Sequence, residues 1–250
     1  MGFTKAEKKI VSLTCVAALF FALPLIASAM HIMEGYLPLT HCIVWGAICL
    51  PFLAAGIISI RRTVEKKKRV LILLAMSGAF IFVISSLKIP SVTGSCSHMT
   101  GTGLAAILFG PVVSSVLGLI VLIFQAILLA HGGLTTLGAN TFSMAVAGPL
   151  LTYFLYLSGK KMGLSRKVNI FIAAALGDLF TYCITSIQLA IAYPSEAGGI
   201  MASAVKFLGV FAPTQLPLAL IEGILTVLVI MGMESYAEPE LKEIAYMEGK

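Results

Sequence analysis

Hydrophobic residues in this chain are gathered in long stretches that short polar connections separate. Beyond the amino-terminal region there are six such stretches, and each is near or beyond the ~20 residues that a membrane-spanning helix needs. They cover approximately 40–60, 70–88, 103–130, 139–158, 168–193 and 205–233. The pattern predicts an all-α polytopic membrane protein, with six spans if every stretch crosses once.

Two clusters of basic residues, within 61–69 and 160–167, test that number. Cytoplasmic loops carry an excess of Lys and Arg, but a single crossing by 103–130 would place the second cluster outside. Gly110 and Pro111 interrupt this stretch, and a proline removes a backbone donor and clashes with the preceding helical turn. A short segment near 101–110 followed by a helix near 111–130 adds one crossing, which returns the second basic cluster to the cytoplasmic side. We therefore expect about seven membrane segments, with His131 outside.

The first 29 residues have the three parts of a secretory leader. Lysines within residues 1–9 precede an apolar run over 10–26, which ends in the small-x-small sequence Ala27, Ser28, Ala29. The alternative is an uncleaved first transmembrane helix, because residues 10–29 are just long enough to span. We predict cleavage, and with it three regions: a signal peptide (1–29), a membrane-embedded domain (30–233) and an acidic cytoplasmic tail (234–250).

Composition supports this class of protein and narrows its chemistry. The chain is 59% hydrophobic and only 11% charged, which is far from the composition of soluble globular proteins. Cys42, Cys49 and Cys183 lie in apolar segments, so no disulfide framework is indicated. The sequence has no GxxxxGK phosphate-binding motif, so we do not expect the chain itself to hydrolyse ATP in that way.

Cleavage after Ala29 would create a metal chelator at the new amino terminus. The Met30 amine, the His31 amide nitrogen and the His31 imidazole would close adjacent five- and six-membered rings around one ion. A fourth position remains for His98, which lies in a loop rich in Gly, Ser and Thr that the topology also places outside. Nitrogen donors in a plane favour Ni(II), Cu(II) or a constrained Co(II) over tetrahedral Zn(II).

Other polar residues are candidates for supporting roles. Cys96 is a thiolate rival to His98 as the fourth ligand. Metal-bound imidazoles usually pass their other N–H to an acceptor, so we expect Glu34, His131 and Asn140 to support the site from the outer shell. Direct ligation by His131 stays open. His41 is expected to be structural, and Asp178 and Glu222 are taken as partners in helix packing.

The chain resembles the CbiM family, the substrate-specific components of cobalt energy-coupling factor importers. The resemblance covers essentially the whole mature chain and rests on four segments: 30–38 (MHIMEGYLP), 94–103 (GSCSHMTGTG), 108–111 (LFGP) and 131–142 (HGGLTTLGANTF). It implies that Co(II) is captured as substrate by Met30, His31 and His98. It also implies cobalamin biosynthesis as the purpose, and a transmembrane coupling subunit, ATPase subunits and a small accessory membrane protein as partners.

The resulting interpretation is a multi-pass inner-membrane protein that binds metal without catalysing a reaction, with its mature amino terminus outside and its carboxyl terminus in the cytoplasm. Nickel-specific relatives share the terminal chelate, so a Ni(II) importer subunit is the first alternative. An intramembrane metal-dependent enzyme using His98, His131 and Asp178 is a second, although no HExxH spacing appears. An importer of an organic vitamin is a third, and it would need aromatic residues around a larger pocket.

Amino-terminal sequencing of the membrane-extracted protein should begin at Met30, and elemental analysis of the same material should find a transition metal. In the uncut chain the nitrogen of Met30 is an amide and cannot close the chelate. Active protein that retains residues 1–29 would therefore contradict this expectation.

Overall fold

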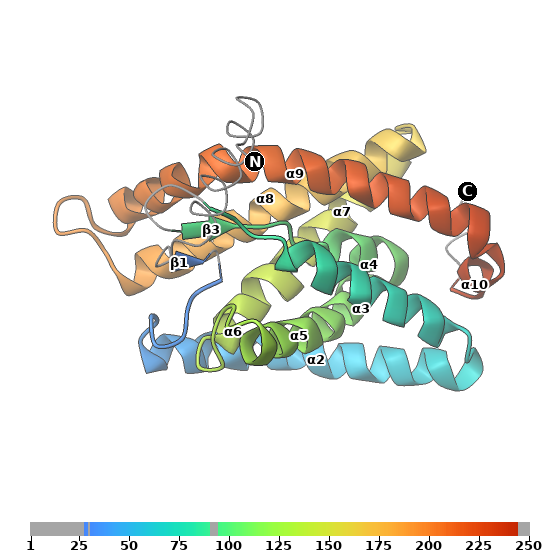
Figure 1. Ribbon diagram of the computed structural model, residues 1–250, viewed down its shortest axis with the longest axis horizontal. Coiled ribbons are helices and arrows are strands. Elements are labelled where there is room, and N and C mark those ends of the chain that lie inside the picture. Colours follow the sequence, from blue (N-terminus) through green and yellow to red (C-terminus); the bar gives the residue numbers. More distant parts are fainter. Residues whose placement is uncertain (1–27, 30, 91–94, 245–250) are drawn as a thin grey trace, which may run out of the picture.

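The computed structural model describes residues 28–29, 31–90 and 95–244, so Met30 and most of the predicted signal peptide lie outside the described residues. The described chain is mostly helical and elongated (Figure 1). Its helices are α2 (Leu39–Lys66), α3 (Val70–Ser86), α4 (Thr102–Phe109), α5 (Pro111–Leu128), α6 (Leu137–Asn140), the π-helix η2 (Thr141–Ala147), α7 (Gly148–Lys161), α8 (Arg166–Ala192), α9 (Gly199–Tyr236) and α10 (Glu238–Glu243). Three short strands form a sheet: β1 (Ser28–Ala29), β2 (Ile89–Pro90) and β3 (Ser95–Ser97).

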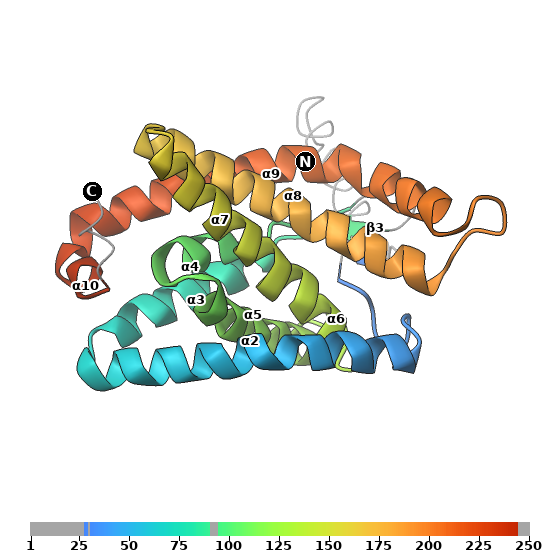
Figure 2. The same ribbon diagram turned by 180° about the vertical axis from the view of Figure 1, so that it is seen from behind.

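The predicted all-α polytopic membrane fold is confirmed. Five helical segments of the described chain are long and apolar enough to cross a bilayer: α2, α5, the continuous run of α6, η2 and α7, then α8 and α9. The apolar helix α3 has 17 residues and is slightly shorter than these five segments. In both views along the short axis, α2 lies along one edge and α9 along the other, with α3, α4, α5 and α7 between them (Figures 1 and 2).

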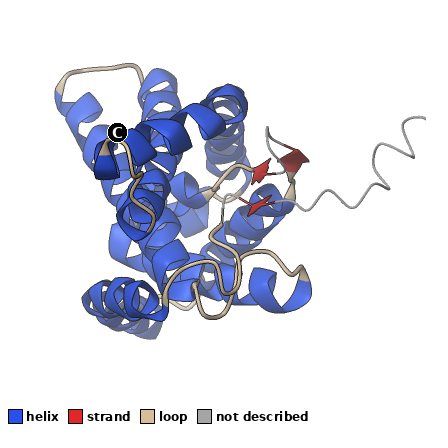
Figure 3. Ribbon diagram, turned by 90° about the vertical axis from the view of Figure 1, so that its left-hand side faces the viewer, coloured by secondary structure: helices blue, strands red, loops and turns tan. Residues whose placement is uncertain are grey.

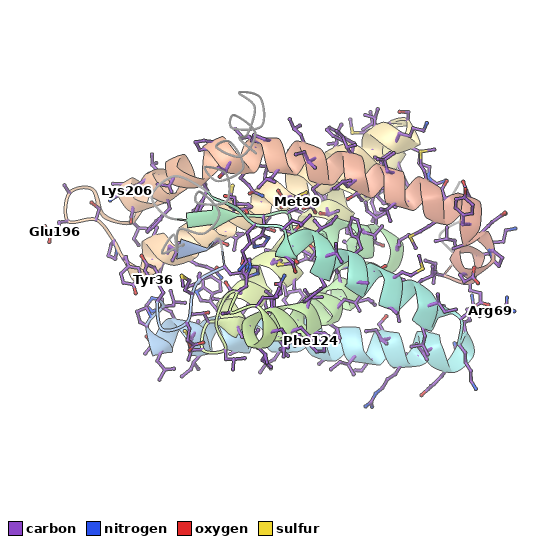
Figure 4. All side chains as sticks on the ribbon, viewed as in Figure 1. Tyr36, Arg69, Met99, Phe124, Glu196 and Lys206 are labelled. Carbon is purple, nitrogen blue, oxygen red and sulfur yellow. The ribbon has the colours of Figure 1, made fainter. Side chains whose placement is uncertain are left out.

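Polarity is distributed as a lipid environment requires. Large apolar side chains such as Leu50 and Phe124 are exposed on the outside of the bundle, where Phe124 points away from α5 (Figure 4). Polar side chains such as Gln125, Thr185 and Ser186 are buried. Lipid tails solvate apolar side chains but offer no hydrogen bonds, so polar groups are placed inside.

The predicted interruption at Gly110 and Pro111 is confirmed. α4 ends at Phe109, Gly110 adopts a positive φ of 87°, and Pro111 is the first residue of α5, where its missing N–H costs no helical hydrogen bond. The eight residues of α4 extend only about 12 Å, so this helix alone cannot cross a hydrocarbon core of about 30 Å. The described residues before it, 98–101, are non-helical and buried, and cover part of the distance.

The segment from 98 to 113 nevertheless runs toward the end of the molecule that carries the basic loop 61–69. Val113 packs with Val70 and Leu74, and Phe109 lies against the same cluster, beside the predicted cytoplasmic loop 61–69. Arg69 is at one end of the long axis, whereas Tyr36 and Glu196 are toward the other (Figure 4). α5 then returns toward the latter end, which is how His131 comes to lie on the same side as His98.

The predicted tail, 234–250, is partly helical where the structure describes it. α9 continues to Tyr236, and α10 turns back so that Leu241 is completely buried beside Leu73 and Met233. The last six residues lie outside the described chain.

Small residues let α5 approach its neighbours inside the bundle. A Cβ atom placed on Gly118 would lie 2.5 Å from the Cβ of Ala145 in η2, well inside van der Waals contact. Ser114, one turn earlier, is fully buried and donates a hydrogen bond to the Thr102 carbonyl. These small residues of α5 therefore serve packing inside the bundle.

Gly118→Ala should destabilise the protein by about 1–3 kcal/mol, because the added methyl group forces α5 and η2 apart. Gly232→Ala in α9 is the matched control, since nothing lies within 4 Å of the added atom, and it should change stability by less than about 0.5 kcal/mol. Thermal unfolding in detergent measures both. Equal midpoints for the two variants would show that α5 and η2 are not in close contact.

Candidate metal centre

The small sheet brings two of the predicted metal ligands together. β1 pairs with β3 in parallel, with Ala29 opposite Cys96, and β2 pairs with the other side of β3 in antiparallel fashion. Figure 3 shows the strands grouped at one side of the helices. Two residues further along the same parallel register, His31 lies beside His98.

Three buried imidazoles form a cluster at this point. The Nδ1 atom of His31 and the Nε2 atom of His98 are 2.8 Å apart, and their rings are nearly parallel. The ring of His131 stands almost perpendicular to both, with its centroid 4.5 Å from that of His31 and 4.7 Å from that of His98. One nitrogen from each histidine lies within 4.8 Å of the other two, and all three residues are at most 3% exposed.

Hydrogen bonding determines which ring nitrogen of His98 has a lone pair free to bind a metal. Its Nδ1 lies 2.7 Å from the carbonyl oxygen of Met99, and a carbonyl can only accept, so this nitrogen carries the hydrogen. The lone pair of His98 is therefore on Nε2, where the Nδ1–H of His31 donates to it. A backbone carbonyl that orients an imidazole through its second nitrogen is the usual arrangement behind a metal-binding histidine.

Three ring nitrogens of the cluster have no hydrogen-bond partner: Nε2 of His31 and both nitrogens of His131. Leaving a buried donor or acceptor unpaired costs about 1–3 kcal/mol. The cluster is therefore an unfavourable structural core but a ready set of donors for a cation.

The three imidazoles are neutral at physiological pH. Burial lowers the pKa of His98 to about 4 and that of His131 to about 2, where the nearby His98 adds to the effect. The pKa of His31 is lowered well below its usual value, first by burial and then by the neighbouring His131 and His98. Neutral imidazole is the form that binds a metal.

Two residues predicted to support the site anchor the segment that carries His31. The backbone N–H of Ile32 donates to Oδ1 of Asn140 at 2.8 Å, and Nδ2 of Asn140 donates to the Ile32 carbonyl at 3.0 Å. The carboxylate of Glu34 accepts from the backbone N–H of Thr135 at 3.1 Å. These contacts involve only residues after position 30, so they survive removal of the leader and of β1 with it.

The remaining predicted residues are placed as follows. Met30 lies outside the described residues, and only the backbone of Cys96 is described. His41 is near the start of α2, where its Nδ1 contacts the hydroxyl of Thr40, and it is not part of the cluster. His131 was expected in the outer shell, and its ring lies within the cluster itself.

Two side chains hold the backbone of His98 from the neighbouring helices. The hydroxyl of Tyr182 in α8 donates to the His98 carbonyl at 2.9 Å. Gln215 in α9 donates to the same carbonyl at 3.4 Å and to Asp178 at 2.5 Å. His98 is thus fixed by both long helices at the edge of the bundle.

Glu222 of α9 fixes Thr100 and Gly101 of the same loop. Its carboxylate accepts hydrogen bonds from the Thr100 backbone at 2.6 Å, the Thr100 hydroxyl at 2.9 Å and the Gly101 backbone at 2.9 Å. Gly101 has a φ of 69°, and a Cβ there would lie 3.0 Å from the Cα of Ile81, so a side chain would disturb the loop.

The sequence interpretation missed Tyr182 and Gln215, and it treated Asp178 and Glu222 as packing partners. A signal for them exists in the spacing. Asp178 and Tyr182 are four residues apart in α8, and Gln215 and Glu222 are seven apart in α9, so each pair lies on one helix face. Polar pairs with this spacing inside apolar helices indicate a shared buried target.

The family model described as "Cobalt uptake substrate-specific transmembrane region", CbiM, matches residues 31–240. The chain belongs to the CbiM family. It is 62% identical over 245 residues to the "Cobalt transport protein CbiM" of Lachnoclostridium phytofermentans, with 98% of each chain covered. It is 56% identical over 224 residues to the protein of the same name from Clostridioides difficile, with 89% of this chain and 90% of that one covered.

Solved structures agree with this assignment. A "transition metal transporter" has a TM-score of 0.72 and 27% identity to this CbiM-family chain, covering 83% of it and 94% of the solved chain. A truncated "transition metal transporter" has a TM-score of 0.70 and 26% identity, covering 82% and 99%. The chain is therefore a multi-pass membrane component of metal uptake, in a family whose described substrate is cobalt.

Acidification should destabilise the metal-free protein. His98 binds a proton at a pKa of about 4 when folded and 6.5 when unfolded, so the unfolded state gains protons first as the pH falls. The contribution of His98 to stability should be constant above pH 6.5 and decrease from there to about pH 4. His98→Gln should reduce this slope in thermal unfolding experiments, and an unchanged slope would show that His98 is not buried in its neutral form.

Proposed function

We propose that this CbiM-family protein is the substrate-capture subunit of an ATP-driven cobalt importer. Signal peptidase frees the amine of Met30, and Co(II) from outside binds to that amine, to the amide nitrogen and Nδ1 of His31, and to Nε2 of His98. The imported cobalt supports cobalamin biosynthesis. The observation that carries this proposal is the 2.8 Å contact between Nδ1 of His31 and Nε2 of His98.

The identity of the two nitrogens supports the chelate. A six-membered ring that contains the metal and the amide nitrogen of a histidine closes through Nδ1, and Nδ1 is the nitrogen that His31 turns toward His98. Two nitrogens bound to one metal at about 2.0–2.1 Å and at a right angle to each other are about 2.9 Å apart. The metal can thus replace the hydrogen between His31 and His98 with little movement of either ring.

The anchoring of residues 32–35 supports a role for the processed terminus. Asn140 and Glu34 bind this segment to the loop before η2 without any contribution from the leader. The free amine would then lie one residue before His31, inside a site whose imidazoles are already buried. Loss of the amide proton on binding makes affinity dependent on pH, so acidification favours release.

The position of the cluster supports capture from outside. The strands that lead to His31 and His98 lie away from the end that carries Arg69 (Figures 1 and 4). Basic residues favour the cytoplasmic side, and this supports an orientation with the cluster toward the outer side and the carboxyl terminus inside.

Release of a tightly chelated ion requires a second conformation with poorer ligand geometry. Tyr182, Gln215 and Glu222 connect the His98 loop to α8 and α9, so a shift of these helices would move His98 away from His31. We assign the energy for this shift to ATP hydrolysis in separate ATPase subunits, transmitted by a transmembrane coupling subunit and assisted by a small accessory membrane protein.

His98→Ala should lower the affinity for Co(II) by more than about 100-fold, since it removes a ligand rather than a supporting residue. His41→Ala is the matched control, because it removes an imidazole outside the cluster, and it should bind cobalt like the unmodified protein. Equilibrium dialysis with elemental analysis of the purified chain measures both. Normal cobalt loading by His98→Ala would refute the proposed site.

A further inference from the structure

His131 is held in the cluster without any hydrogen bond to its ring. It lies three residues beyond the end of α5, and its backbone N–H donates to the carbonyl of Gln125 in that helix at 3.1 Å. The next residue, Gly132, has a φ of 79°, and a Cβ there would lie 3.3 Å from the Cβ of His31. The loop is therefore built to bring this ring against His31, and it leaves both ring nitrogens buried and unpaired.

The chelate in the proposed function does not by itself explain a preference for cobalt. Nitrogen sites bind Ni(II) more tightly than Co(II) in the general order of divalent metals, and a planar nitrogen set is a preferred geometry of Ni(II). Selectivity for Co(II) must then come from geometry rather than from the strength of the four planar donors. A fifth donor outside the plane is such a geometric element.

We propose that His131 is an axial ligand of the bound metal and the residue that makes the site prefer Co(II) to Ni(II). This inference rests on the proposed function and deepens it. Planar Ni(II) has a filled orbital along the axial direction and gains little from a fifth donor, whereas planar Co(II) has a half-filled orbital there and binds one readily. The imidazole of His131 therefore adds affinity for Co(II) selectively.

The geometry of the cluster fits this role. The rings of His31 and His98 are within 13° of parallel, while that of His131 is turned by 85° and 75° from them, so its edge approaches the pair from a separate direction. An axial nitrogen stands at a right angle to the planar donors, so it is about 2.9 Å from each of them when the bonds are about 2.0–2.1 Å. The three candidate ligand atoms lie within 4.8 Å of one another, so the ring of His131 moves toward His31 and His98 when the metal binds.

Electron paramagnetic resonance of the purified, cobalt-loaded protein tests the assignment directly. In planar Co(II) the unpaired electron occupies the axial orbital, so one axial nitrogen splits each cobalt line into a triplet. We expect this triplet in the unmodified protein and its loss in His131→Ala, with recovery on adding free imidazole to the cavity. His131→Phe, which keeps a buried ring without nitrogen, is the second variant and should also lack the triplet.

Competition between the two metals gives an independent measurement. The ratio of Co(II) to Ni(II) affinity should decrease by about 10-fold or more in His131→Ala and His131→Phe, with Ni(II) affinity maintained. An unmodified protein without the triplet, or variants with an unchanged affinity ratio, would overturn the assignment of His131. These outcomes are separate from failure of the proposed function, in which His98→Ala would still bind both metals.

Discussion

The contact between His31 and His98 is the constraint on which the arrangement of this protein depends. The two residues are 67 positions apart, and both are buried as neutral imidazoles. Bringing them together requires the amino-terminal segment to enter the bundle and the loop before α4 to stay buried inside it. Each requirement is met by hydrogen bonds from a different part of the chain, so the site depends on the packing of the whole bundle.

On one side, Asn140 pairs with both backbone groups of Ile32, so the segment carrying His31 is bound like an additional strand. On the other side, Tyr182 binds the backbone of His98, and Glu222 binds the backbone N–H groups of Thr100 and Gly101. Non-helical backbone is tolerated at membrane depth only where protein groups replace water as partners. The buried polar residues of α8 and α9 therefore support the loop that carries His98, and in the proposed function they connect the candidate metal site to the helices whose movement would open it.

The sequence predicted much of this architecture. Long apolar stretches and the positions of basic residues determined an all-α membrane fold, and the conflict between them required an additional membrane segment. Pro111 located the break correctly, because a proline acts through its own backbone and its effect does not depend on distant residues. The sequence also named His31, His98, Glu34 and Asn140 as candidate site residues. The structure brings His31 and His98 into one cluster, and it joins Asn140 to Ile32 and Glu34 to Thr135.

Other features were decided only by the tertiary structure. The sequence left His131 in a supporting role, since nothing local shows that Gly132 brings this ring against His31. The helix spacing of Tyr182, Gln215 and Glu222 signals a buried target but does not identify it as the His98 loop, because hydrogen-bond partners across helices depend on how the helices pack. Length, hydropathy and chain breaks are properties of single segments and can be read from sequence. The choice of contacts among buried polar groups belongs to the packed bundle, where the cost of leaving such groups unpaired selects their partners.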